Sequence, residues 1–342
     1  MKLAFIGTGK IIADAMHAIT PLKNIEYTAV FARPHSREKA EKFADEYGIK
    51  EIYTDYEKLL DESQCDTVYI GLINSAHYPY AKEALLHGKN VILEKPFTGF
   101  LKDTLELKRI AEEKKLFIFE AVTVLHNPVI GNMKKNLPKL GKITMYLANY
   151  SQYSSLYDDY LEGKIGHAFS AEYYGGALFD INVYNIHYAV CLFGKPESVK
   201  YYPNFGFNGI DTSGTLVMEY DGFSAVCTGA KDSDSPGFVS VQGETGYIKI
   251  EGKPNIADKV LTHYYVPGER VRDAAGSWVR ASEEEIFKAP EVYHRMTEEF
   301  ADFAKIIDEK DFDAAKPYMD ETVTVMEILE EARLSAGIKF EK

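Results

Sequence analysis

The sequence contains little cysteine and no long apolar run. Its 342 residues include three cysteines, Cys65, Cys191 and Cys227, which lie far apart and form no CxxC pair. This pattern argues against a disulfide scaffold or a cysteine zinc site and fits a reducing compartment. No apolar stretch reaches the roughly 18 residues of a membrane span, and the N-terminus begins with a strand pattern rather than a signal segment. We therefore expect a cytoplasmic protein that inserts into no membrane and binds no metal.

Positive charge is also scarce. Thirty-nine Lys and Arg side chains stand against 52 Asp and Glu, a formal net charge of 39 − 52 = −13. Such an acidic chain is poorly suited to nucleic acid or to an anionic membrane surface, so a small molecule is the expected partner. With 46% hydrophobic residues, the chain is long enough for about two domains with substantial cores.

The first 120 residues alternate between short apolar runs and helical patterns. Strands separated by helices predict an α/β domain with a doubly wound parallel sheet. The expected strands are residues 2–6, 25–32, 66–71, 91–93 and 116–119, and the expected helices are residues 10–20, 36–47, 56–62, 79–87 and 102–114.

A glycine turn joins the first expected strand to the first helix. Its glycines allow a tight turn and a close approach to a pyrophosphate, whose charge the helix start would stabilise. The residues expected to contact a dinucleotide here are Gly7, Thr8, Gly9, Lys10 and Ile11. The third small residue usual in such turns would fall at Ile12, whose bulk should push helix and strand apart. An ordinary strand-to-helix turn is the alternative interpretation.

The end of the second expected strand indicates which dinucleotide would fit. NAD-selective sites commonly place an acidic residue there for the ribose 2′-hydroxyl, whereas a 2′-phosphate favours cationic side chains. This sequence has no acid at that point but has Arg33 and Arg37. NADP is therefore the preferred cofactor, with NAD possible. A solvated basic turn that caps a helix through Ser36 is the alternative.

Polar residues follow the third and fourth expected strands. Ligands of a parallel sheet bind outside the carboxyl ends of its strands. Asn74 and His77 could therefore line a nicotinamide ribose, although His77 could equally be an ordinary helix-start residue. Lys95, directly before Pro96, would project from the end of its strand into a binding crevice.

The pattern becomes antiparallel beyond residue 121. We expect a dinucleotide-binding domain at residues 1–121 and an α+β domain at residues 122–342, with an open, mostly antiparallel sheet and helices on one face. Asp221-Gly222 is a strong hairpin signal, and residues 243–246 form a looser one.

The expected strand 142–153 alternates in polarity. Ile143, Met145 and Leu147 share one face, whereas Tyr146 and Tyr150 lie on the other. We expect the tyrosine face to be the one without helices. It would then need a partner subunit, so a homodimer or homotetramer through this sheet is expected.

Three reactive side chains lie in the segment from Gly176 to Leu192. If this segment is helical, Asp180, Tyr184 and His187 occupy positions i, i+4 and i+7 on one face. A carboxylate, a phenol and an imidazole together suit proton transfer better than an apolar core. A polar face at a domain junction is the alternative, and His187 could relay a proton or simply pack.

The chain ends in two amphipathic patterns. They cover residues 291–309 and 319–336, and the first carries an apolar stripe that includes Phe300 and Phe303, most simply core. The single tryptophan, Trp278, lies in a Gly-Ser loop, where it could be a rim or interface residue.

Taken together, these motifs resemble the glucose-fructose oxidoreductase / inositol dehydrogenase (Gfo/Idh/MocA) family. The resemblance rests on the Gly-Thr-Gly turn, on Glu94-Lys95-Pro96, and on Gly-Gly-Ala-Leu-Phe-Asp with a tyrosine four residues after the aspartate. It spans nearly the whole chain, and residues 116–121 place it nearest the dimeric dihydrodiol dehydrogenase branch. The resemblance implies a Rossmann domain followed by a substrate-binding and oligomerisation domain.

The resemblance also implies roles for individual residues. Lys95 matches the lysine that contacts the reacting oxygen beside the nicotinamide, Asp180 the aspartate that orients substrate, and Tyr184 the proton donor and acceptor. Glu94 matches a cofactor-side position, as do Gly7, Gly9 and Asn74. Two positions depart from the family pattern, because Ile12 replaces a small residue and Asn182 stands where glycine is usual.

The expected function is an NAD(P)-dependent oxidoreductase that transfers a hydride between nicotinamide and a secondary alcohol or carbonyl of a sugar, cyclitol or dihydrodiol. Lys95, Asp180, Tyr184 and His187 would bind the substrate, and Lys95 would favour the phenolate of Tyr184. An NAD-dependent glycosidase that uses transient oxidation is one alternative. A non-catalytic nucleotide-sensing regulator on the same scaffold is the other.

Overall fold

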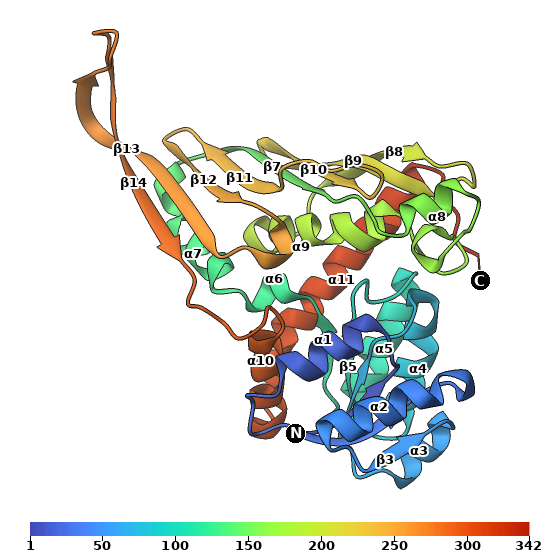
Figure 1. Cartoon of the computed structure of the whole chain (residues 1–342). Coiled ribbons are helices and arrows are strands. Elements are labelled where there is room, and N and C mark those ends of the chain that lie inside the picture. The colour runs from blue at the N-terminus through green and yellow to red at the C-terminus, as the bar shows by residue number, and fades with distance from the viewer. Residues whose placement is uncertain (342) are drawn as a thin grey trace.

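Two β-sheets of different construction organise the computed structural model, which describes residues 1–341 (Figure 1). The first sheet has six strands in the order β3-β2-β1-β4-β5-β6, and all its paired strands are parallel. The second has eight strands in the order β14-β13-β12-β11-β7-β10-β9-β8, and only β7 and β10 pair in parallel. Both expected sheet types are therefore confirmed.

The first sheet is doubly wound, with helices on both faces. Its strands are β1 (Lys2–Ile6), β2 (Glu26–Phe31), β3 (Glu51–Tyr53), β4 (Thr67–Ile70), β5 (Asn90–Glu94) and β6 (Ile118–Ala121). Its helices are α1 (Lys10–Ala18), α2 (Arg37–Tyr47), α3 (Tyr56–Glu62), α4 (Asn74–Leu86) and α5 (Leu101–Lys114). Strand order reverses between β1 and β4, and ligands bind at such a switch point.

Two features of this domain differ from the expectation. The edge strand β3 was not predicted, because three half-buried residues are too few to show a periodicity. Helix α4 begins at Asn74 rather than at the expected residue 79, so Pro79 lies inside the helix and not at its start. Because proline has no N–H, α4 lacks the hydrogen bond that this position would donate to the carbonyl oxygen of Ser75.

The bulk of Ile12 is accommodated by a glycine in a neighbouring segment. Ile12 is fully buried in α1. Gly71 follows β4, and a Cβ atom there would lie 2.7 Å from Cδ1 of Ile12 and 2.9 Å from Cγ2 of Ile11. The missing side chain of Gly71 therefore makes the room that a small third residue of the turn would otherwise make.

The second sheet is mixed and carries helices on one face. Its strands are β7 (Ile143–Ser151), β8 (Ser198–Phe205), β9 (Asp211–Tyr220), β10 (Phe223–Ala230), β11 (Phe238–Gly243), β12 (Gly246–Glu251), β13 (Lys259–Arg272) and β14 (Trp278–Lys288). Both predicted hairpins are confirmed, since Tyr220 pairs with Phe223 and Gly243 with Gly246.

The remaining helices lie between and beside the sheets. They are α6 (Thr123–His126), α7 (Pro128–Asn136), α8 (Tyr157–Leu161), a π-helical turn (Leu178–Asn182), α9 (Val183–Phe193), α10 (Thr297–Glu309) and α11 (Phe312–Ser335). Short 3-10 turns occur at Pro34–Ser36, Leu137–Leu140, His167–Phe169 and Pro254–Ile256.

The covered face of the second sheet is the tyrosine face. Tyr146 and Tyr150 are buried, and the Tyr146 hydroxyl donates a hydrogen bond to the backbone oxygen of Asn185 in α9 at 2.9 Å. Met145 on the opposite face is 39% exposed. The prediction that the tyrosines lie on the open face is therefore wrong. Alternation divides a strand into two faces, but a helix elsewhere in the chain decides which face is covered.

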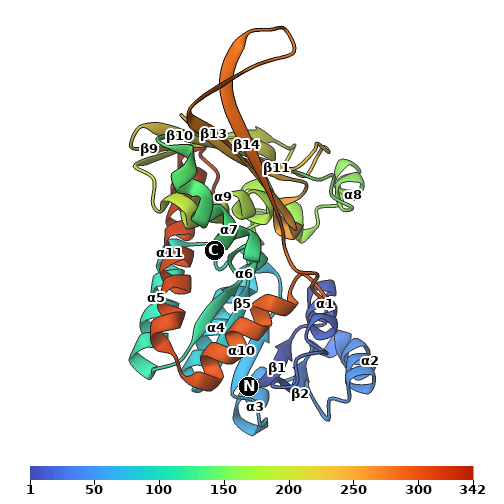
Figure 2. The same cartoon turned by 90° about the vertical axis from the view of Figure 1, so that its left-hand side faces the viewer.

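After β14 the chain returns to the first sheet, where α10 packs, and α11 then runs from the first sheet to the second (Figure 2). Phe300 and Phe303 of α10 are fully buried against the first sheet, where Phe303 stacks on Phe119 of β6 at a centroid distance of 4.7 Å. The predicted apolar stripe is thus core. The predicted domain boundary at residue 121 remains a prediction. Residues 297–309 pack on the sheet that the first 121 residues form.

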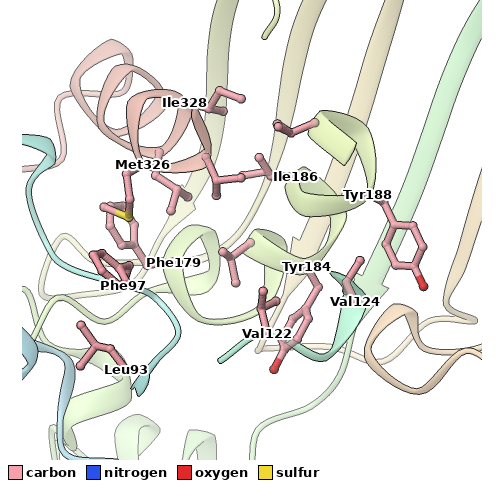
Figure 3. Close-up of a cluster of buried hydrophobic side chains, with 14 of the residues drawn as sticks. Leu93, Phe97, Val122, Val124, Phe179, Tyr184, Ile186, Tyr188, Met326 and Ile328 are labelled. Atoms are coloured by element: carbon pink, nitrogen blue, oxygen red, sulfur yellow. The ribbon is translucent and has the colours of Figure 1, made fainter. Parts of the chain in front are cut away.

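A continuous apolar cluster connects the two sheets (Figure 3). Leu93 and Phe97 flank the end of β5, Ile186 comes from α9, and Met326 from α11; all are buried. This packing fixes the end of β5 against the start of α9. The segments that carry Lys95, Asp180 and Tyr184 are therefore held by one core.

Candidate active site

Lys95 and two residues of the second domain meet between the sheets. Lys95 follows β5, and its Nζ donates hydrogen bonds to the backbone oxygen of Asp180 at 2.7 Å and to Oδ1 of the same residue at 3.0 Å. The same Nζ lies 5.1 Å from the ring centroid of Tyr184. The structure thus brings together the three residues that the sequence selects as catalytic.

A second lysine, which the sequence reasoning missed, completes this cluster. Lys231 directly follows β10 and is 3% exposed. Its Nζ donates to Oδ2 of Asp180 at 2.5 Å and to the backbone oxygen of Ala168 at 2.9 Å. A single lysine at the end of a strand carries no local signal that it will meet a carboxylate 51 residues earlier.

The two lysines keep the Asp180 carboxylate ionised. Burial alone would raise the pKa of Asp180, but the charges of Lys231 and Lys95 outweigh it and hold the pKa far below its usual value. Burial would lower the pKa of Lys95, whereas Asp180 and Tyr184 raise it above its usual value. Lys95 therefore remains an ammonium group at neutral pH. It can donate hydrogen bonds and stabilise negative charge, but it cannot act as a base.

The phenol of Tyr184 is neutral in this structure. Burial raises its pKa, and the opposing charges of Lys95 and Arg295 do not compensate. The expectation that Lys95 brings the phenol toward a neutral pKa is therefore not met, because Tyr184 is only 8% exposed and burial penalises the phenolate. A neutral phenol at this place is a proton donor. Arg295, between β14 and α10, was not identified from the sequence.

A π-helical turn gives Asp180 its position. The backbone is π-helical from Leu178 to Asn182 and becomes α-helical at Val183. π-Helical turns of this kind are frequent at functional sites. The predicted single face at i, i+4 and i+7 does not hold as one site: Asp180 and Tyr184 face Lys95, whereas His187 faces Glu120 and Glu321.

His187 lies in the core rather than at the substrate. It is fully buried, with Nδ1 3.2 Å from a carboxylate oxygen of Glu321 in α11 and Nε2 3.6 Å from one of Glu120 in β6. Burial would lower its pKa, but the two carboxylates raise it to about 9. The prediction that His187 binds substrate is therefore wrong, since no surface of its ring is accessible. It holds α9 to both neighbouring elements.

A cavity of about 450 Å³ opens at the glycine turn. Gly7 has φ +124°, and a Cβ atom there would lie 2.9 Å from the backbone oxygen of Gly71, so only glycine fits without strain. Gly9 precedes α1 without a side-chain cap, which leaves N–H groups of the first turn free for an anion. The lining residues are Gly7, Thr8, Gly9, Lys10, Ile11, Ala32, Arg33, His35, Ser36, Gly71, Leu72, Ile73, Asn74 and His167. This cradle fits the pyrophosphate of a dinucleotide.

Only some residues of the basic turn after β2 line the cavity. Arg33 lines the cavity, together with His35 and Ser36, which the sequence reasoning did not assign to the cofactor. Arg37 does not line it; its Nε donates to Glu41 in α2 at 2.9 Å. Ser36 precedes α2, but its side chain makes no capping hydrogen bond. The cationic character of this end of the cavity therefore comes from Arg33.

The other predicted cofactor residues have different roles. Asn74 lines the cavity, and its Nδ2 donates to the backbone oxygen of Tyr174 in the second domain at 3.0 Å. His77 is fully buried, with its ring nitrogens 2.9 Å from the oxygen of Pro96 and 3.2 Å from that of Leu72. His77 therefore does not line a ribose; it joins the loop after β4 to the segment after Lys95.

Glu94 also lies behind the cavity. It is 7% exposed and accepts a hydrogen bond from the Tyr69 hydroxyl at 2.6 Å and one from the backbone N–H of Lys95 at 3.2 Å. Burial raises the pKa of its carboxyl. Glu94 thus orients the backbone of Lys95 and does not line the cavity.

The second departure from the family pattern is matched by another glycine. Asn182 is fully buried, and its Nδ2 donates to the backbone oxygen of Cys227 at 3.0 Å. A Cβ atom at Gly229 of β10 would lie 2.8 Å from Cβ of Asn182. Strand β10 therefore makes room for the asparagine, and the chain keeps its close approach between α9 and the sheet.

Within residues 1–341, no helix is both long and apolar enough to cross a membrane. The same residues contain no group of three or more His, Cys, Asp or Glu side chains arranged to hold a metal ion.

Comparison with known proteins identifies relatives over the whole chain. A model described as "Oxidoreductase family, NAD-binding Rossmann fold" matches residues 1–121, and one of the GFO/IDH/MocA C-terminal domain matches residues 138–249. The scyllo-inositol 2-dehydrogenase (NADP(+)) IolU of Bacillus subtilis is 31% identical over 99% of this chain and 98% of its own length. The trans-1,2-dihydrobenzene-1,2-diol dehydrogenase of Xenopus tropicalis is 28% identical over 73% of this chain and 74% of its own. The likeness to the dihydrodiol dehydrogenases is thus weaker than that to IolU.

Solved structures show the same fold. KijD10, a 3-ketoreductase from Actinomadura kijaniata solved with NADP and TDP-benzene, superimposes with a TM-score of 0.81 at 20% identity, covering 98% of this chain and 97% of that one. The match includes both sheets, so the two-domain arrangement is shared. With family models on both domains and a relative above 30% identity along almost the entire length, the chain belongs to the GFO/IDH/MocA oxidoreductase family.

Proposed function

We propose that this NAD(P)-dependent oxidoreductase interconverts a secondary alcohol and a ketone on a cyclitol or sugar, with NADP as its preferred cofactor. The observation that carries the proposal is the meeting of Lys95, Asp180 and Tyr184 between the two domains. The names of IolU, a scyllo-inositol dehydrogenase, and of KijD10, a 3-ketoreductase, support a polyol or sugar-like substrate. A dihydrodiol is the less favoured substrate class.

The proposed chemistry divides the work between Lys95 and Tyr184. The ammonium of Lys95 stabilises negative charge that develops on the substrate oxygen. The neutral phenol of Tyr184 donates a proton to that oxygen during carbonyl reduction, which leaves a phenolate, and in alcohol oxidation the phenolate takes the proton from the alcohol. A bound nicotinamide supplies or accepts the hydride. Asp180, held by Lys95 and Lys231, fixes the lysine and presents a carboxylate that is 40% exposed to substrate hydroxyl groups.

The proposed NADP preference rests on Arg33. Its guanidinium borders the cavity at the end of β2, where no carboxylate is present to favour an unmodified ribose. IolU is named as an NADP-dependent enzyme, and KijD10 was solved with NADP. The residues proposed to hold the dinucleotide are Gly7, Thr8, Gly9, Lys10, Ile11, Arg33, His35, Ser36 and Asn74.

Two further proposals concern the whole protein. The open face of the second sheet, on which Met145 lies, is proposed to join subunits of a homo-oligomer. A cytoplasmic location is proposed because all three cysteines are unpaired.

The decisive experiment measures turnover with scyllo-inositol, other cyclitols, sugars and dihydrodiols, each with NADP and NAD. We expect Lys95→Met and Tyr184→Phe to lower turnover by about 100-fold or more, the usual effect of removing a proton donor or charge stabiliser, while cofactor binding persists by calorimetry. Exposed Tyr202, changed to Phe, is the matched control and should retain activity.

Near-normal turnover in both active-site variants would refute the assignment. Hydrolysis of a glycoside without net change of the cofactor would indicate the glycosidase alternative. Cofactor binding without turnover on any substrate would indicate the regulator.

A further inference from the structure

A buried carboxylate at the start of β9 lies directly behind the π-helical turn. Asp211 is 1% exposed, and no step of the proposed chemistry uses it. Its Oδ2 accepts a hydrogen bond from the backbone N–H of Leu178 at 2.7 Å and another from the Tyr201 hydroxyl at 2.9 Å. Leu178 is the first residue of the turn, and Asp180 is the third. Asp211 therefore holds the start of the segment that carries Asp180.

The backbone before the turn leaves space for this carboxylate. Gly176 has φ +103°, and a Cβ atom there would overlap Oδ1 of Asp211. The carboxylate thus occupies the space that a side chain would need, and only glycine fits. The backbone oxygen of Gly176 in turn accepts a hydrogen bond from the N–H of Asp180 at 3.1 Å. Asp211 therefore lies against Gly176 and Leu178, the residues between which the turn begins.

The start of β9 also holds the lysine on the other side of Asp180. The backbone N–H of Lys231 donates to the backbone oxygen of Thr212, the residue after Asp211, at 2.8 Å. The Lys231 ammonium then reaches the Asp180 carboxylate at 2.5 Å. The backbone and the carboxylate of Asp180 are thus both held, each through one intermediate residue, from the first two residues of β9.

The charge of Asp211 depends on pH in an accessible range. Burial raises the pKa of its carboxyl from 3.8 to about 6, although the Leu178 N–H, the Tyr201 hydroxyl and the charge of Lys231 oppose the rise. Asp232 lies on the far side of Tyr201 and adds a second negative charge there. Asp211 is therefore ionised at pH 7.5 and takes up a proton as the pH falls through about 6.

We propose that Asp211 is a positioning residue of the reaction: its ionised carboxylate fixes the π-helical turn and thereby sets the position of Asp180 between its two lysines. The inference rests on the proposed function, because that function gives Asp180 its role at the substrate. A charged acceptor forms stronger hydrogen bonds than a neutral one, and a negative charge suits the free N–H groups at a helix start. Protonated Asp211 holds the turn less firmly, so Asp180 and Lys95 lose their alignment with the substrate.

The variant Asp211→Asn tests the proposal, because asparagine has the shape of the protonated carboxyl and no charge. The assay reduces the ketone of the cyclitol or sugar with the highest turnover in the screen above, with saturating NADPH, so that kcat/KM reports the enzyme–cofactor complex. In this direction neutral Tyr184 is the active form, and Asp180 and Lys95 do not titrate near pH 6.

We expect the wild-type kcat/KM to fall by about 10- to 100-fold as the pH drops from 7.5 to 5, since a displacement of about 1 Å can cost 100-fold. Asp211→Asn should show the lower value at every pH from 5 to 8. Its dissociation constant for NADPH should change less than twofold, because Asp211 does not line the cofactor cavity. Asp221→Asn, the same change in the exposed β9–β10 turn, is the matched control and should keep the wild-type profile.

A second variant keeps the carboxylate and changes only its pKa. Tyr201→Phe removes a hydrogen bond that stabilises ionised Asp211, so the acid limb of the profile should move to higher pH by about one unit. The rate at pH 8 should stay close to that of the wild type, because Asp211 is still ionised there. Circular dichroism confirms that each variant is folded.

Three results would overturn the proposal. The first is a wild-type profile for Asp211→Asn, and the second is a lower rate of this variant with an unchanged acid limb, which shows a purely structural role. The third, decisive even where Asp211→Asn does not fold, is an acid limb that Tyr201→Phe leaves in place. The proposed function fails by a different result, near-normal turnover of Lys95→Met and Tyr184→Phe, so the two failures are distinguishable.

Discussion

Replacing His187 should remove a pH-dependent part of the stability of this protein. The ring is enclosed by Glu120 of β6 and Glu321 of α11, and the side chain of Glu321 also interacts with Cys191 of α9, next to Lys134 of α7. The carboxylates raise the pKa of His187 to about 9, against an ordinary value of 6.5. The imidazolium is therefore stabilised by folding.

The sign and size of the effect follow from this shift. Because the folded pKa is higher than the unfolded one, the stabilisation is complete below about pH 6.5 and is lost as the pH rises through about 9. A difference of about 2.5 pKa units corresponds to about 3 kcal/mol. With an unfolding entropy of about 2.1 cal/mol/K per residue over the chain, this amounts to about 4 °C in melting temperature.

The assay compares His187→Leu with the wild type by thermal unfolding at pH values from 6 to 9.5. We expect the variant to be less stable than the wild type at pH 6, because it leaves the buried Glu120 and the partly buried Glu321 without their cation. The difference between the two proteins should shrink by about 4 °C between pH 6.5 and 9.5. His35→Leu, at an exposed position, serves as the control and should follow the wild-type curve.

Parallel curves for His187→Leu and the wild type across this range would show that the ring is neutral at pH 6. The account of His187 as a charged clamp between α9, β6 and α11 would then be refuted.

Two further predictions concern charged residues at the site. Arg33→Ala should weaken NADP binding by about 10- to 100-fold and leave NAD binding nearly unchanged, because only the 2′-phosphate forms a charge-assisted contact; equal losses in calorimetry would contradict this. Lys231→Met should lower the melting temperature by about 4–7 °C, since breaking a buried ion pair costs about 3–5 kcal/mol. The matched change Lys249→Met removes a surface ion pair that water screens, so it should lower the melting temperature much less; an equal effect of both changes would argue against the buried pair.

The sequence by itself determined the architecture and the position of Lys95. Strands that alternate with helices leave only a parallel, doubly wound sheet, and the carboxyl ends of such strands necessarily share one edge. The glycine turn and Lys95 could therefore be placed at the same edge before any coordinates. The two hairpins followed in the same way, because the turn residues act locally.

Tertiary structure decided everything that depends on segments far apart in the chain. Periodicity in β7 divided its residues into two faces, but α9, whose Asn185 lies 39 residues after Tyr146, covers the face with Tyr146. Lys231 reaches Asp180 across 51 residues. Helical spacing grouped His187 with Tyr184, yet β6 and α11 pack over His187, and their carboxylates hold it in the core.

The two departures from the family pattern show the same division. Ile12 and Asn182 are each larger than the residue expected at their positions, and from the sequence alone they suggest a looser fit. In the structure each faces a glycine from another element, Gly71 and Gly229, whose missing side chain supplies the space. The sequence shows which residues are unusually large. Only the packing shows whether there is space for their side chains, because that space depends on neighbouring segments that lie far away in the sequence.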